Sequence, residues 1–212
     1  MLKAVIFDLD GLLVDSTPLQ LEANRIFIES FGKLYLTPKS GREGMRIIDI
    51  IRDYKDIYDL PGNLEDLYKK RQLIYFKLVK SQLSLFPGVD AVIEKIMQKK
   101  IRMALATSGD AYYVKLVFQK FPQVQNAMEI VVTGDDVERG KPYPDIYIEA
   151  LKQLKIKAAE AVVVEDSVNG ILAAKAAKIQ VIAIPNRNYP DADYSMVDTA
   201  FPDLKTLAKK IF

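Results

Sequence analysis

The sequence predicts an α/β fold: a parallel sheet covered by helices on both faces, with a helical segment inserted near the N-terminus. Short apolar runs alternate with segments of helical periodicity through the second half of the chain, which is typical of a buried parallel sheet. The first two apolar runs are separated by roughly 90 residues, far more than a single crossover needs. That long connection indicates an insertion.

Five apolar runs are the predicted strands, and the helical patterns between them predict a Rossmann-like core. The strands are expected at Ala4–Phe7, Ile101–Ala106, Glu129–Val132, Ala161–Val164 and Val181–Ile184. The helices are expected at Val89–Lys99, Ala111–Lys120, Pro144–Leu154, Val168–Ala177 and Leu204–Ile211.

The long connection reads as helical. Apolar residues keep helical spacing at Leu19, Ala23, Ile26 and Phe27, and again at Leu64, Leu67, Ile74 and Leu78. We therefore interpret residues 16–84 as an all-helical domain inserted into an α/β core formed by residues 1–15 and 85–212. The two crossings, near Asp15–Thr17 and Ser84–Gly88, are the expected hinges.

Composition excludes several kinds of chemistry. The chain contains no Cys and no His, which excludes thiolate nucleophiles and argues against Ser-His-Asp hydrolysis and the usual zinc sites. Any metal is expected to be a hard cation held by oxygen atoms, with Mg²⁺ as the first candidate. A net charge of only +2 predicts no nucleic-acid surface. No apolar run has the length of a membrane span, and we expect a cytoplasmic monomer.

Polar residues follow the predicted strands where ligands bind in parallel sheets, at the carboxyl ends. The first strand ends in Asp8 and Asp10, the second in Thr107-Ser108-Gly109 and the fourth in Glu165-Asp166-Ser167. Gly140-Lys141-Pro142 lies between the third and fourth strands. Asp8, Asp10 and Asp166 are candidates for holding Mg²⁺, which explains how close carboxylates coexist. Lys141 and the backbone N–H groups after Thr107 are suited to phosphoryl oxygens. The metal and Lys141 would keep Asp8 ionised and nucleophilic.

Four stretches in this order, FDLDGLLVDS, ATSG, GKPYPD and VVVEDSVNG, resemble the motifs of the haloacid dehalogenase superfamily. The helical insertion resembles the small cap domain of that superfamily. The layout is similar to that of β-phosphoglucomutases and of sugar-phosphate and phosphoglycolate phosphatases. The resemblance covers essentially the whole chain and implies a cofactor, Mg²⁺, and a small phosphorylated metabolite as substrate.

The resemblance also implies a role for each motif residue. Asp8 is the expected nucleophile that becomes an aspartyl-phosphate, and Asp10 the general acid and base, with its backbone carbonyl as a further metal ligand. Thr107 would bind the phosphoryl oxygens, together with Ser108 and Gly109. Lys141 would offset their charge and orient Asp8. Asp166 would ligate Mg²⁺, with Glu165 beside it or directly bound.

Asp10 argues for phosphate esters, because the dehalogenase and phosphonate-cleaving branches lack an Asp at that position. The alternatives that remain are a phosphatase, a β-phosphoglucomutase-type mutase and a non-catalytic binding module. Resembling mutases have a His in the cap hinge where this chain has Gln20, which favours a phosphatase. All the motif residues are present, which argues against a non-catalytic module.

The loop KSGREGMR is the expected specificity segment of the cap. Arg42 or Arg46 is suited to a substrate phosphate, carboxylate or hydroxyl, although a surface charge at a helix start is an equal alternative. Asp15 and Ser16 are expected to cap the first inserted helix, and Ser167 the helix after Asp166.

Overall fold

The computed structural model describes residues 1–36 and 41–210. Two sequence-based predictions extend beyond these residues. Lys39 and Ser40 of the specificity loop, and Ile211 at the end of the last predicted helix, lie outside the described residues.

A six-stranded parallel sheet forms the core, with the strand order β3-β2-β1-β4-β5-β6. The strands are β1 (Ala4–Phe7), β2 (Arg102–Ala106), β3 (Ile130–Val132), β4 (Ala161–Glu165), β5 (Gln180–Ala183) and β6 (Thr199–Ala200). All five predicted strands are confirmed to within a residue at each end. The sixth, β6, has only two residues, both exposed, and is too short to show an apolar pattern. The α/β fold class is confirmed.

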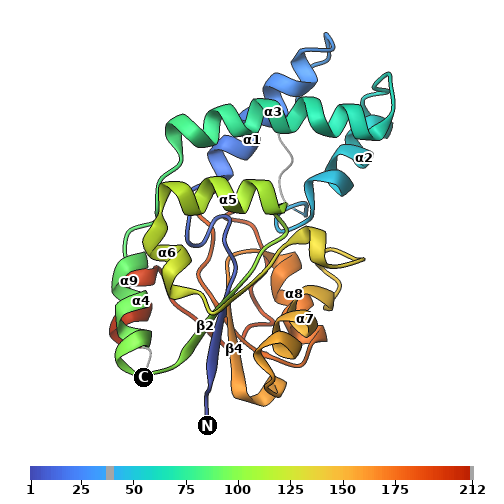
Figure 1. Cartoon of the computed structure of the whole chain (residues 1–212). Helices are drawn as coiled ribbons and strands as arrows, with labels where there is room; N and C mark the ends of the chain where they lie inside the picture. The colour runs from blue at the N-terminus through green and yellow to red at the C-terminus, as the bar shows by residue number, and fades with distance from the viewer. Residues whose placement is uncertain (37–40, 211–212) are drawn as a thin grey trace.

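Helices cover both faces of the sheet, as Figure 1 shows. One face carries α4 (Val89–Gln98), α5 (Ala111–Lys120), α6 (Pro122–Ala127) and α9 (Leu204–Lys210); the other carries α7 (Asp145–Leu154) and α8 (Val168–Ala176). Two short 3₁₀ turns, η1 (Gly134–Asp136) and η2 (Ala158–Glu160), precede α7 and β4. The central strand β1 is fully buried, because its alternate side chains enter the two cores on opposite faces of the sheet.

Three helices occupy the inserted segment: α1 (Thr17–Glu29), α2 (Ile47–Ile57) and α3 (Leu64–Gln82). In Figure 1 they lie above the end of the sheet that is opposite both termini. They enclose a separate apolar cluster, which includes Phe27, Ile51, Tyr54 and Leu67. The two crossings run side by side, because the Asp15 N–H donates to the Ser84 carbonyl at 2.9 Å and the Phe86 N–H to the Leu13 carbonyl at 2.9 Å.

Of the two helix N-caps predicted from the sequence, one is present in the structure. The Ser167 hydroxyl accepts a hydrogen bond from the Gly170 N–H at 3.1 Å and caps α8, as predicted. The prediction for α1 is wrong. Ser16 occupies the N-cap position, but its side chain makes no capping bond, and Asp15 instead accepts from Arg187 at 2.8 Å. Pro18 in the first turn supplies the fixed backbone angle that begins this helix. Within the described residues, no helix is both long enough and apolar enough for a membrane span.

Candidate active site

Lys141 is the buried centre of the polar cluster at the carboxyl ends of the strands. Its Nζ lies 2.6 Å from Asp8 Oδ1 and 2.6 Å from Glu165 Oε1, and it also donates to the Ala106 carbonyl at 3.3 Å. Burial alone would lower the pKa of Lys141, but the charges of Asp8 and Glu165 raise it well above its ordinary value. Lys141 is therefore a permanent cation that joins three strand ends.

Asp8 follows β1 directly, and its backbone N–H donates to the Val164 carbonyl of β4 at 3.0 Å. This bond holds the residue in register at the edge of the sheet. Burial raises the pKa of Asp8 to about 8, and the charge of Lys141 opposes that shift. Lys141 lowers the pKa of Asp8, as expected for a residue that helps to keep Asp8 ionised. Its effect is smaller than the increase in pKa that burial causes. A bound cation would add to its effect.

Glu165, the last residue of β4, has both carboxylate oxygens occupied. Oε1 accepts from Lys141 and from the Tyr147 hydroxyl at 2.8 Å. Oε2 accepts at 2.9 Å from each of three donors: the Asp166 N–H, the Ser167 N–H and the Ser167 hydroxyl. Burial opposes ionisation, but Lys141 and these donors hold the pKa of Glu165 below its usual value. Glu165 thus orients its neighbours through bonds that it already makes.

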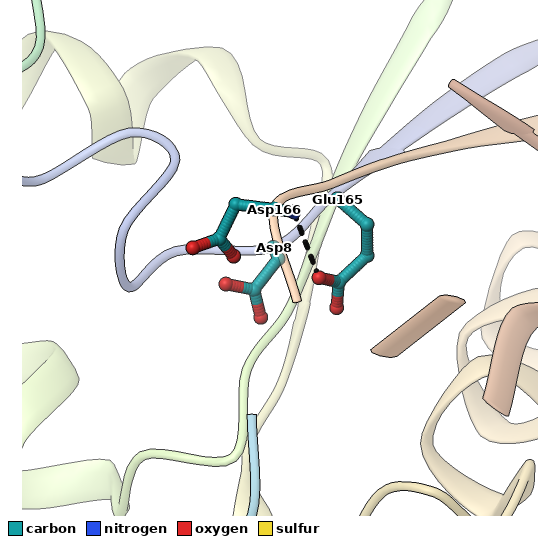
Figure 2. A group of neighbouring side chains, drawn as sticks. All are labelled: Asp8, Glu165 and Asp166. Carbon is teal, nitrogen blue, oxygen red and sulfur yellow. Dashed lines mark hydrogen bonds between the residues drawn. The ribbon is translucent and has the colours of Figure 1, made fainter. Parts of the chain in front are cut away.

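Asp8, Glu165 and Asp166 form a group whose carboxylate oxygens lie within 4.8 Å of one another (Figure 2). Asp166 accepts from the Asn186 amide at 2.6 Å through Oδ2, whereas its buried Oδ1 has no partner within the described residues. Burial, with the charges of Glu165 and Asp8, raises the pKa of Asp166 well above its ordinary value. An unpartnered buried oxygen beside two other carboxylates fits a hard divalent cation such as Mg²⁺.

Two glycines make room for these carboxylates. Gly11 has φ +78°, and a Cβ there would lie 2.1 Å from Asp166 Oδ2. A Cβ on Gly170 would lie 1.7 Å from Glu165 Oε1. Any larger residue at either position would displace an acidic side chain of the cluster.

Asp10 is held apart from the acidic group by its own donors. The Tyr113 hydroxyl donates to Oδ1 at 2.6 Å, and the Thr107 hydroxyl lies 3.3 Å from Oδ2. Burial raises the pKa of Asp10, and both hydroxyls oppose that shift. Thr107 is fully buried and also accepts from the Gly109 N–H at 3.0 Å. In this arrangement Thr107 positions Asp10 and the turn after β2.

A cavity of about 100 Å³ lies between the acidic cluster and the inserted helices. The core lines it with Asp8, Asp10, Ser108, Gly109, Asp166, Asn186 and Tyr189. Residues of the inserted segment that line it include Gln20, Asn24, Arg42, Glu43 and Tyr54. The sequence-predicted residues Asp8, Asp10, Asp166, Ser108, Gly109, Gln20 and Arg42 therefore meet around one cavity.

Arg46 does not line this cavity. Its guanidinium pairs with Asp49 at 2.9 Å and donates to the backbone carbonyls of Val137 at 3.3 Å and Glu138 at 3.0 Å. It borders a neighbouring cavity instead. Arg42 does reach the first cavity, although its Nε is paired with Asp53 at 3.2 Å. Of the two predicted arginines, only Arg42 lines the cavity that contains Asp8 and Asp10.

Several further contacts join the inserted segment to the core. The Ser108 hydroxyl donates to the Gly44 carbonyl at 2.6 Å, so a residue predicted for substrate contact holds the loop that carries Arg42. Asp110, the N-cap of α5, accepts at 2.6 Å from both the Tyr68 hydroxyl and the Gln72 amide of α3. The helical segment is thus seated on the core around the cavity.

Sequence reasoning missed Tyr113, Tyr147 and Asn186. Each supplies a hydrogen bond to a motif carboxylate: Asp10, Glu165 and Asp166, respectively. Tyr113 and Tyr147 lie on apolar faces of helices, where an aromatic residue reads as ordinary core. Only the direction of their hydroxyls in the folded chain distinguishes them.

Comparison with known proteins decides the family. A model of the family described as haloacid dehalogenase-like hydrolase matches residues 5–184. The chain belongs to this family. The resemblance inferred from the four motifs is therefore confirmed.

Relatives cover most of the chain. A "Phosphorylated carbohydrates phosphatase" of Thermotoga maritima is 34% identical over 188 residues, which are 85% of this chain and 84% of that protein. A "(DL)-glycerol-3-phosphatase 2" of Arabidopsis thaliana is 30% identical over 92% of this chain and 83% of its own. Among solved structures, CbbY from Rhodobacter sphaeroides in complex with phosphate has a TM-score of 0.87 at 24% identity, covering 98% of this chain and 96% of that one. This structural likeness confirms the fold.

Proposed function

We propose that the protein is a Mg²⁺-dependent phosphatase that hydrolyses a small phosphate monoester through an aspartyl-phosphate on Asp8. The observation that carries this proposal is the position of Asp8: it borders the cavity while Lys141 holds its Oδ1 at 2.6 Å. Its other oxygen accepts no hydrogen bond from the described residues. A buried carboxylate with one anchored oxygen and one open oxygen suits in-line attack on phosphorus.

Asp10 is the proposed proton-transfer group. It shares the cavity with Asp8, and its two hydroxyl donors, Tyr113 and Thr107, fix the direction of its carboxylate. Asp10 first protonates the leaving oxygen of the ester and then accepts a proton from the water that hydrolyses the intermediate. Burial raises its pKa, which favours the protonated form needed for the first of these steps.

Asp8 and Asp166 are the residues that would hold Mg²⁺, with Glu165 beside them in the same acidic group. The bound cation would reduce the repulsion between Asp8 and the anionic phosphoryl group. Because both Glu165 oxygens already accept hydrogen bonds, we assign Glu165 to orienting Asp166 and Lys141. Lys141 and the turn at Ser108 and Gly109 would carry the remaining phosphoryl charge.

A sugar phosphate or similar metabolite is the proposed substrate class. The cavity of about 100 Å³ is smaller than most ligand pockets, which favours a compact substrate, and polar side chains such as Gln20, Asn24 and Arg42 form its far wall. The two relatives named above as phosphatases of phosphorylated carbohydrates and of glycerol 3-phosphate support this class.

We propose that residues 16–84 act as a cap domain that closes over the site and that the paired crossings at Asp15 and Ser84 are its hinges. Support comes from the separate apolar cluster of this segment and from the cavity that it shares with the core. Closure would exclude bulk water from the phosphoryl group.

A β-phosphoglucomutase-type mutase is the second candidate function. Such a mutase must prevent Asp10 from activating water until a second substrate is bound. At the cap-hinge position this chain has Gln20, whose amide does not titrate near neutral pH. Its carbonyl oxygen is also already bonded to Arg71. We therefore favour hydrolysis.

A phosphate ester panel tests the proposal. The purified protein with Mg²⁺ is incubated with p-nitrophenyl phosphate, glucose 6-phosphate, glycerol 3-phosphate and β-glucose 1-phosphate, and released phosphate is measured. We expect phosphate from at least one ester, released in single turnovers as fast as the ester disappears. Conversion of β-glucose 1-phosphate to glucose 6-phosphate well ahead of phosphate release would establish the mutase. Failure to cleave any ester, with Mg²⁺ bound, would favour a non-catalytic binding module.

A further inference from the structure

Arg71, on α3 of the proposed cap, is a fully buried cation without a carboxylate partner among the described residues. Burial lowers the pKa of Arg71 to about 10, so the side chain remains charged near neutral pH. Burying an unpaired charge is expensive unless every donor finds an acceptor. The groups that accept hydrogen bonds from Arg71 therefore indicate the structural role of this side chain.

Three amide side chains surround the guanidinium. Nε donates to Asn24 Oδ1 at 2.9 Å, and Nη1 donates to Gln72 Oε1 at 2.9 Å. Nη2 donates to the Gln20 backbone carbonyl at 3.1 Å and, in a shorter contact, to Gln20 Oε1. All four acceptors are neutral carbonyl oxygens.

This arrangement decides which way each amide faces. A guanidinium only donates, so the three amides must turn their oxygens towards Arg71 and their NH₂ groups away from it. The Gln72 NH₂ then donates to Asp110 at 2.6 Å, and the Asn24 NH₂ to the Tyr54 hydroxyl at 3.4 Å. The Gln20 NH₂ has no acceptor within the described residues. Gln20 lines the cavity that contains Asp8 and Asp10, and it also borders the neighbouring cavity beside Arg46.

An unused acceptor lines the same cavity. Glu43 Oε1 is buried and receives no hydrogen bond from the described residues, although Oε2 accepts from the Gly41 N–H at 2.6 Å. The cap wall therefore offers an unpaired amide donor and an unpaired carboxylate acceptor. Hydroxyl groups both donate and accept, so neighbouring hydroxyls satisfy such a pair.

We propose that Arg71 is a positioning residue for substrate specificity: it locks Gln20 with its NH₂ group towards the cavity, where this group donates to a hydroxyl oxygen of a polyol or sugar leaving group. This inference rests on the proposed phosphatase function and narrows its substrate class. A hydrogen bond from the guanidinium to the amide oxygen also polarises the amide and strengthens its N–H donors. Esters without hydroxyls gain nothing from this contact.

The test compares two substrates in matched variants. Arg71→Met keeps most of the side-chain volume and removes every donor, and Gln20→Met removes the proposed contact itself. Arg25→Met is the control, because Arg25 lies on the exposed face of α1 and pairs with Glu22 and Glu29. For each protein, kcat and KM are measured with p-nitrophenyl phosphate and with the panel's best polyol or sugar phosphate.

We expect Arg71→Met and Gln20→Met each to raise KM for the polyol phosphate by about tenfold relative to KM for p-nitrophenyl phosphate. The double variant Arg71→Met/Gln20→Met should show little further change in the ratio of KM values, because the two substitutions remove the same contact to the substrate. Arg25→Met should leave the ratio unchanged. Arg71→Lys keeps the charge but cannot hold three amides, so it should also shift the ratio, and it serves as the second variant if Arg71→Met fails to fold.

Equal losses with both substrates would overturn the inference, since they would show a general structural role for Arg71. Additive effects in the double variant would overturn it as well, and so would a parent enzyme that cleaves p-nitrophenyl phosphate but no polyol or sugar phosphate. If the parent cleaves no phosphate ester at all, the proposed function itself fails, which separates the two outcomes.

Discussion

Lys141 Nζ lies 2.6 Å from Asp8 Oδ1, although the two residues are 133 positions apart in the chain. The same ammonium group lies 2.6 Å from Glu165, and neither Lys141 nor Glu165 is exposed to solvent. A single buried cation thus pairs with two carboxylates and fixes one oxygen of the proposed nucleophile.

Asp8→Asn should lower kcat by several orders of magnitude, because an amide keeps the shape of the side chain but is not a nucleophile. The circular dichroism spectrum and the unfolding midpoint should remain close to those of the parent. Asp90→Asn, on the exposed face of α4, is the matched control. Activity within about tenfold of the parent, equivalent to only about 1.4 kcal/mol in the barrier, would rule out the assigned role.

Lys141→Met should reduce both activity and stability. The substitution leaves the Asp8 and Glu165 carboxylates buried without their shared cation, and breaking a buried ion pair in this way lowers the free energy of unfolding by roughly 3–5 kcal/mol. Urea unfolding at pH 8 measures the loss. Lys152→Met removes an exposed lysine on α7 and should change stability by less than about 1 kcal/mol. Equal stabilities of the two variants would contradict the role of Lys141 as the shared counter-ion.

Asp166→Asn should weaken Mg²⁺ binding in the absence of any substrate. Mg²⁺ should raise the thermal unfolding midpoint of the parent, because a ligand that binds only the folded state stabilises it. The substitution removes a charged ligand beside Asp8, so the shift should largely disappear. Asp56→Asn, on the exposed face of α2, should keep the full shift. Chelation should abolish catalysis reversibly, and Ca²⁺ should support it poorly because its coordination is larger and looser.

Arg46→Ala should weaken closure of the proposed cap, because it removes the hydrogen bonds to the Val137 and Glu138 carbonyls of the core. We expect KM to rise by roughly threefold to tenfold for every phosphate ester, without the substrate preference expected at Arg71. Arg52→Ala is the control, since Arg52 pairs with the same Asp49 but has no hydrogen bond to the core among the described contacts. Equal kinetics for the two variants would show that the link from Arg46 to the core does not assist closure.

Tyr113→Phe should lower kcat by about tenfold, because it removes the 2.6 Å hydrogen bond that orients the proton-transfer group Asp10. The phenyl ring keeps its packing, so the unfolding midpoint should change little. Tyr112→Phe alters the exposed neighbouring tyrosine and should leave kcat unchanged. A Tyr113→Phe enzyme with the kcat of the parent would mean that Thr107 alone is enough to position Asp10.

The sequence by itself determined the alternation of strands and helices and the placement of polar residues after the strands, and it indicated a helical segment after the first strand. These features are local. Four-residue runs such as Ala4–Phe7 are apolar because both faces of a central parallel strand are covered. An Asp that directly follows such a run must lie at the carboxyl end of the strand, where parallel sheets bind their ligands. The four motifs, in their order along the chain, then identified the family.

Only the tertiary structure decided how the individual polar atoms are used. It showed that the Glu165 oxygens are occupied while one oxygen of Asp166 is open, that Arg42 rather than Arg46 reaches the cavity, and that Ser16 does not cap α1. It also placed Arg71 behind Gln20, 51 residues away in the chain. The physical reason is that periodicity reports whether a position is buried, whereas the partner of a buried polar group depends on how distant segments pack and on which donors and acceptors remain unsatisfied there.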